Sequence, residues 1–130
     1  EVVEASVTAM KGLAPDGVGM AAFPPSVLGI PEDYVTYGWV ADKLTPHPLK
    51  TWLDAIELPN GGADGLPATY VLCTDPALAM TQFAWIAEQQ KGQPDWDVVE
   101  LATGHDAMVT EPDKVAAIIA AAANRKKESL

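Results

Sequence analysis

The pattern of hydrophobic and polar residues changes near residue 67. Residues 1–67 hold most of the eleven prolines and many glycines, a texture typical of loops and short helices. Within this stretch, a proline at position 31 and apolar residues three or four positions apart predict a short helix over residues 31–44. The spaced residues are Tyr34, Tyr37, Val40, Ala41 and Leu44.

Beyond residue 67 the chain alternates between strand-like and helix-like patterns. Residues 68–74 form an apolar run without polar alternation, which predicts a strand buried on both faces of a parallel sheet. A helix over 78–90, a strand over 97–101 and a helix over 112–124 follow. This order indicates an α/β fold. Because two strands alone make no stable sheet, we expect another polypeptide segment to supply the rest.

Composition narrows the classes of partner. With 130 residues and 48% hydrophobic residues, the chain is of domain size and can form a core. Its net charge of -10 repels nucleic acid and anionic lipid, and no apolar stretch is long enough to span a bilayer. We therefore expect neither nucleic acid nor membrane as a partner. The single Cys73 is interpreted as a buried, inert thiol, which leaves the cellular compartment open.

The most informative segment is the end of the second predicted strand. Gly104 follows an apolar strand, His105 follows at once, and the sequence Glu-Pro-Asp over 111–113 opens an alanine-rich helix. An imidazole at a strand end can serve as a base near neutral pH. By contrast His47, between Pro46 and Pro48, has no second ligand at metal-like spacing and is interpreted as structural.

Three stretches together resemble the carboxy-terminal half of an α/β-hydrolase, of the small esterase and hydroxynitrile-lyase-like branch. These stretches are residues 45–49, Thr-Pro-His-Pro-Leu; residues 69–75, Thr-Tyr-Val-Leu-Cys-Thr-Asp; and residues 103–108, Thr-Gly-His-Asp-Ala-Met, with Glu-Pro following at 111–112. The resemblance implies that residues 1–58 are a lid or cap segment. Residues 59–130 would be the last strands and helices of the core, completed by an amino-terminal half that precedes residue 1.

In that family the catalytic triad runs serine, acid, histidine along the chain. His105 matches the histidine position. The family's aspartate aligns with Pro76, so Asp75, one residue earlier, is the candidate acid, and Asp106 is the alternative. None of the three serines lies in a Gly-x-Ser-x-Gly motif. The nucleophile is therefore expected in the amino-terminal half.

The resemblance predicts a serine-dependent hydrolase of esters or lactones of small apolar or aromatic compounds, with no cofactor and no metal, active only with its amino-terminal half. The candidate substrate-binding residues are Met20, Phe23, Trp39 and Met108. A non-catalytic small-molecule-binding relative is the alternative, because the acid is displaced by one position. A hydroxynitrile-type lyase would need a lysine near the pocket, and none stands beside His105.

Overall fold

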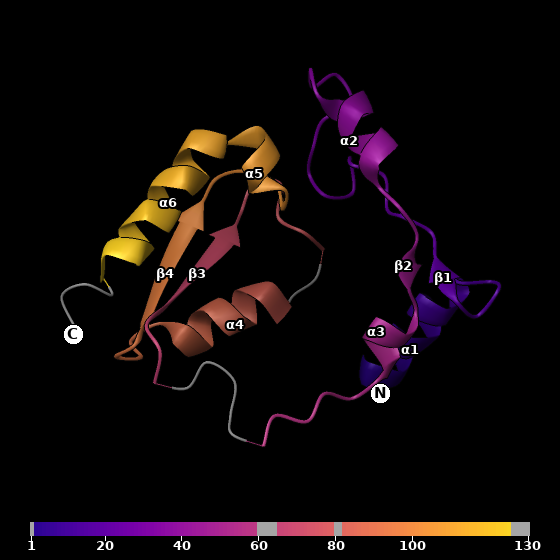
Figure 1. Ribbon diagram of the computed structural model, residues 1–130, viewed down its shortest axis with the longest axis horizontal. Coiled ribbons are helices and arrows are strands. Elements are labelled where there is room, and N and C mark those ends of the chain that lie inside the picture. The colour runs from indigo at the N-terminus through magenta and orange to yellow at the C-terminus, as the bar shows by residue number, and fades with distance from the viewer. Residues whose placement is uncertain (1, 60–64, 80–81, 126–130) are drawn as a thin grey trace.

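A computed structural model of the chain describes residues 2–59, 65–79 and 82–125. In Figure 1 the elements fall into two groups, one from the amino-terminal half of the sequence and one from the carboxy-terminal half. The chain is a mixed α/β structure with a small parallel sheet. Within the described residues, no helix has the length and apolar character needed to cross a membrane.

The parallel sheet contains β3, Ala68–Cys73, and β4, Trp96–Leu101. Their register pairs Ala68 with Trp96 and Cys73 with Leu101. The bounds of both strands agree with the sequence prediction to within one residue at each end, because turns on either side of a short, mainly apolar run mark a strand clearly. The predicted burial of residues 68–74 on both faces is wrong: each residue of β3 is half-buried, because the strand has one neighbouring strand in the described structure. In the described part of the chain this sheet has two strands, so the second edge of β3 adjoins no strand.

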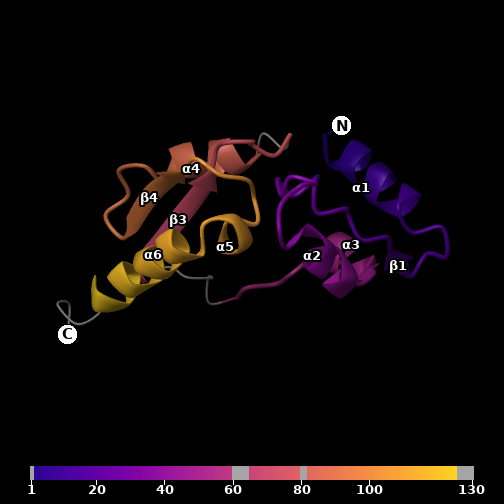
Figure 2. The same ribbon diagram turned by 90° about the horizontal axis from the view of Figure 1, so that it is seen from above.

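Helices cover the two faces of this sheet. In both views α4, Gln82–Gln90, lies on one face and α6, Pro112–Arg125, lies on the other (Figures 1 and 2). The hydroxyl of Tyr70 donates to the carbonyl of Phe83 at the start of α4, at 3.2 Å. Because side chains alternate along a strand, the next residue, Val71, faces α6.

The two predicted helices in this half occur, with differences at their starts. The helix predicted over 78–90 begins only at Gln82 in the structure, and residues 80–81 lie outside the described residues. The final helix begins at Pro112 as predicted, with Asp113 in its first turn, where an acidic side chain favours the helix dipole. A short helix that was not predicted, α5, Ala107–Thr110, joins the His105 loop to α6.

The amino-terminal half is more regular than the sequence suggested. It contains α1, Val2–Gly12; β1, Gly19–Met20; α2, Tyr37–Lys43; β2, His47–Pro48; and α3, Lys50–Leu53. The two short strands pair antiparallel. The eleven-residue α1 corrects the expectation of only loops and short helices. It is free of proline and glycine up to its last residue, has Glu4 in its first turn and Lys11 in its last, and so suits a helix.

The helix predicted over 31–44 is wrong in its first six residues. Residues 31–36 form two successive turns, in which the amide of Tyr34 donates to Pro31 and the amide of Tyr37 donates to Tyr34, at 3.0 and 2.9 Å. The helix itself begins at Tyr37. Local spacing of apolar residues fitted a longer helix, but the turns direct Tyr34 toward α5, where its hydroxyl finds a partner.

Candidate functional site

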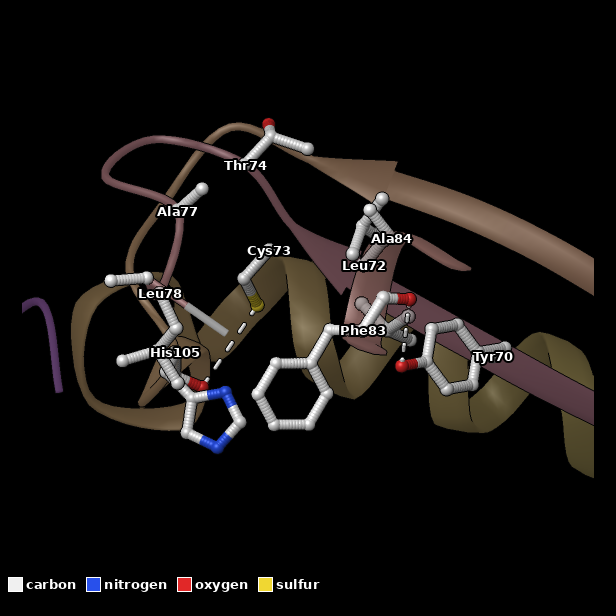
Figure 3. Close-up of a pocket in the computed structure, with 11 residues that line it drawn as sticks. Tyr70, Leu72, Cys73, Thr74, Ala77, Leu78, Phe83, Ala84 and His105 are labelled. Atoms are coloured by element: carbon white, nitrogen blue, oxygen red, sulfur yellow. Dashed lines mark hydrogen bonds between the residues drawn. The ribbon is translucent and has the colours of Figure 1, made fainter. Parts of the chain in front are cut away.

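His105 lies in the short loop between β4 and α5. The strand ends at Leu101 and α5 begins at Ala107, so the imidazole is carried near the carboxyl end of the sheet. The side chain is exposed, and its ring contacts the ring of Phe83 from α4, with centroids 5.3 Å apart and planes tilted by 34°. Figure 3 shows the two rings side by side. The imidazole is therefore open to solvent on one side and packed against an aromatic ring on the other.

Two hollows adjoin His105. The larger, called here the β3-edge pocket, has a volume of about 550 Å³ and lies between β3 and the start of α4 (Figure 3). Its lining is mainly apolar and consists of residues 70–74, 77–79, 83, 84 and 105. A smaller hollow of about 200 Å³, called here the α6 pocket, separates Val71 and Cys73 from α6 and also includes His105. The imidazole therefore borders apolar space on two sides.

Asp75, the predicted acid, lies just beyond β3 at the same end of the sheet. Its amide donates to the carbonyl of Thr103 at 3.1 Å, which ties the two strand ends together. Its carboxylate is exposed, and within the described residues it makes no hydrogen bond to His105. The backbone of Asp75 is thus hydrogen-bonded to the loop that carries His105, whereas its carboxylate is not hydrogen-bonded to the imidazole in the described structure.

Asp106 has the closer electrostatic relation to His105. Partial burial raises the pKa of the Asp106 carboxyl above its ordinary value, and the nearby His105 acts in the opposite direction. The amides of Val109 and Thr110 both donate to the Asp106 carbonyl, at 2.8 and 3.3 Å. Its backbone is therefore fixed at the start of α5.

Cys73 is half-buried rather than buried, which corrects the sequence interpretation. It lines both pockets because β3 has an open edge and the α6 pocket lies beside it. Its thiol lies 3.9 Å from the carbonyl oxygen of His105 and donates to it (Figure 3). Desolvation, and after it the charge of Asp106, raises the pKa of this thiol, so at neutral pH it is protonated and a weak nucleophile.

The four predicted substrate-binding residues are dispersed. Met20 is only 2% exposed and packs with Ala14 and Leu49 in a small core. Met20 and Phe23 also line a separate hollow of about 220 Å³ in the amino-terminal half. Trp39 is 63% exposed on α2 and lines neither hollow beside His105. Of the four, Met108 alone shares a hollow, the α6 pocket, with His105, and it is 60% exposed.

His47 has the contacts of a structural residue. Thr51 donates its hydroxyl proton to the carbonyl of Pro48 at 2.7 Å, so the Nε2 of His47, 2.6 Å from the same hydroxyl oxygen, acts as the donor to it. The ring also meets Trp52 edge-on, with centroids 6.2 Å apart. These contacts join β2 to α3.

Sequence reasoning missed two features of the site. Phe83 lies within the helix predicted over residues 78–90, and that position alone gives no sign of a contact with His105. Thr103 is buried, and its hydroxyl lies 2.6 Å from the hydroxyl of Thr110, so that a hydrogen bond closes the histidine loop from inside. A threonine directly before Gly104 was the available signal. In the described residues, no group of three or more His, Cys, Asp or Glu side chains could hold a metal ion.

Comparison with known proteins gives one distant relationship. A carbendazim hydrolyzing esterase of Nocardioides sp. (strain SG-4G) is 33% identical over 85 residues, which is 64% of this chain and 34% of that protein. The chain thus matches about a third of the length of this relative. No family model and no solved structure matches the chain. The relationship is to an esterase, over part of its length.

Proposed function

We propose that the chain is the carboxy-terminal part of a serine-dependent hydrolase of esters or lactones, with His105 as its general base. The observation that carries the proposal is that His105 borders the mainly apolar β3-edge pocket. Such a pocket suits the apolar part of a small substrate. The imidazole at its border is placed to take a proton from a nucleophile that attacks a substrate bound there. The distant relationship to an esterase supports the same class of reaction.

The nucleophile and the oxyanion-binding amides belong, in this proposal, to an amino-terminal half of the same fold, which pairs with the sheet. A serine hydroxyl attacks the ester carbonyl carbon while His105 removes its proton. His105 then passes that proton to the leaving alcohol, and a water molecule, deprotonated in turn, hydrolyses the acyl-serine. Removal of one oxyanion donor typically costs about 3 kcal/mol, so the two halves are expected to work only together.

A serine-directed fluorophosphonate tests the proposal. In the protein completed by its amino-terminal half, we expect labelling of a serine outside this chain, together with turnover of p-nitrophenyl esters. Carbendazim, the compound in the name of the related esterase, is a second substrate for the assay. A complete, folded protein that neither reacts with the fluorophosphonate nor hydrolyses these compounds would refute the hydrolase proposal.

The acid that orients His105 is proposed to be Asp75, with Asp106 as the alternative. We expect Asp75→Asn to lower kcat by about 10²- to 10⁴-fold through loss of the carboxylate that steadies the imidazolium. Asp106→Asn serves as the matched variant, since it removes a carboxylate next to the same histidine. Steady-state kinetics distinguishes the two: a large loss in Asp106→Asn with normal Asp75→Asn would assign the role to Asp106.

A non-catalytic binding protein is the second candidate. The specific observation in its favour is that Asp75 and His105 are not hydrogen-bonded to one another in the described structure. In this alternative the β3-edge pocket would bind a small apolar molecule without chemical change. Saturable binding of a p-nitrophenyl ester without hydrolysis, in a protein whose amino-terminal half has an intact Gly-x-Ser-x-Gly motif, would favour the binding protein.

A further inference from the structure

The loop that carries His105 is also touched from outside the sheet, by residues 28–34 of the amino-terminal half. The amide of Asp106 donates to the carbonyl of Leu28 at 3.2 Å. Figures 1 and 2 both show this part of the chain reaching toward the turn before α5. The contact therefore joins two segments that are distant in sequence, at the residue next to the candidate base.

Two glycines make this contact possible. A Cβ atom added to Gly104 would lie 2.5 Å from the carbonyl oxygen and 2.6 Å from the Cα of Gly29. One added to Gly29 would lie 2.5 Å from the Cα of Gly104, and Gly29 also has a φ of +85°, which favours glycine. Backbone atoms cannot rotate away as a flexible side chain can. Any side chain at either position would push the two segments apart.

Tyr34 makes the second attachment. Its half-buried hydroxyl lies 3.3 Å from the carbonyl of Val109 and 3.5 Å from that of Thr110, and it donates to them. These carbonyls end α5, where backbone acceptors lack intrahelical partners. The tyrosine thus caps the short helix that immediately follows the histidine loop.

The same segment has its own anchor. Ile30 is 0% exposed, and its amide donates to the carbonyl of Pro25 at 3.0 Å. A segment with a fully buried side chain is held in one place, so it can restrain what it touches. The His105 loop is thus held by two sets of contacts: those with residues 28–34, and the hydrogen bond between Thr103 and Thr110.

We propose that residues 28–34, called here the strap, are positioning residues for His105, with the Gly29–Gly104 contact and the Tyr34 hydroxyl holding the loop in its working geometry. The role in turnover rests on the proposed hydrolase function, whereas the restraint of the loop does not. A strap of this kind would keep the imidazole aligned with substrate and serine. A misplacement of about 1 Å in such a group can cost about 100-fold in rate.

Amide hydrogen exchange tests directly whether the strap restrains the His105 loop. It is measured on the protein together with its proposed amino-terminal half. In Tyr34→Phe, which removes only the hydroxyl, we expect exchange in residues 105–111 to be about 2- to 10-fold faster. In Gly104→Ala the Asp106 amide should exchange at least about 10-fold faster, because its bond to Leu28 is broken. The matched controls are Tyr37→Phe, whose hydroxyl has no hydrogen bond within the described structure, and Gly38→Ala, where a Cβ meets nothing within 4 Å.

Kinetics on the same variants tests the positioning role. We expect Tyr34→Phe and Gly104→Ala to lower kcat while KM stays near the parent value, since neither residue lines the β3-edge pocket. Unchanged exchange in both variants would overturn the strap, whatever the activity. Faster exchange with unchanged kcat would overturn the positioning role. Parent protein that lacks ester turnover would refute the proposed function and leave the exchange result to decide the restraint.

Discussion

Replacing His105 by alanine is expected to lower the turnover of p-nitrophenyl esters by about 10²- to 10⁴-fold in the protein completed by the proposed amino-terminal half. General acid–base catalysis by a positioned imidazole is worth about this much, and no other described side chain is placed to replace it. His105 is one of eleven residues that line the β3-edge pocket, so its truncation leaves most of that lining in place. KM should therefore change much less than kcat.

His47→Ala is the matched control for that experiment. The chain has two histidines, and His47 is bonded to Thr51 in the amino-terminal half. We expect its removal to leave turnover within about twofold of the parent, because contacts between β2 and α3 do not reach the histidine loop. Equal turnover in His105→Ala and the parent protein would end the assignment of His105 as base.

The second large effect is expected on stability. Ile30→Ala should reduce the free energy of unfolding by about 2 to 5 kcal/mol, because a fully buried aliphatic side chain is lost and a cavity is left in its place. Urea unfolding followed by circular dichroism measures this change. Since Ile30 belongs to the strap, the same variant should also loosen the loop that carries His105.

Val35→Ala provides the comparison for Ile30. Val35 is 91% exposed and lies in the neighbouring turn, so its truncation should change the free energy of unfolding by no more than about 0.5 kcal/mol. A loss in Ile30→Ala that is equally small would show that residue 30 is not packed in solution as it is in the structure.

The carboxy-terminal strands could be predicted closely because their signal is local. Residues 68–74 carry no charged side chain, and β3 lies between α4 on one face and α6 on the other, with each of its residues half-buried. Pro112 likewise marks the start of α6, because proline suits the first position of a helix. His105 could be identified as a strand-end histidine for the same reason: the apolar residues stop just before it.

The remaining features of the site depend on contacts between distant segments. The sequence does not distinguish Gly29 from the other glycines of its turn-rich stretch. Its importance follows from its close approach to Gly104, which only the three-dimensional structure shows. Tyr34 fitted a helical stripe, although its hydroxyl is used at α5. The acid was uncertain for a different reason: a shift of one residue at a strand end reverses the direction of a side chain, and spacing alone cannot fix it.

The long separation between the strap and its docking loop has a consequence for biosynthesis. Tyr34 and Val109 are 75 positions apart, so on the ribosome the strap emerges well before the residues it must meet. Until translation reaches α5, the strap lacks the loop that it contacts and the Tyr34 hydroxyl lacks its acceptor carbonyls, so this segment is open to chaperones and proteases. Nascent chains that stall after the strap and before α5 would therefore be the most susceptible to proteolysis.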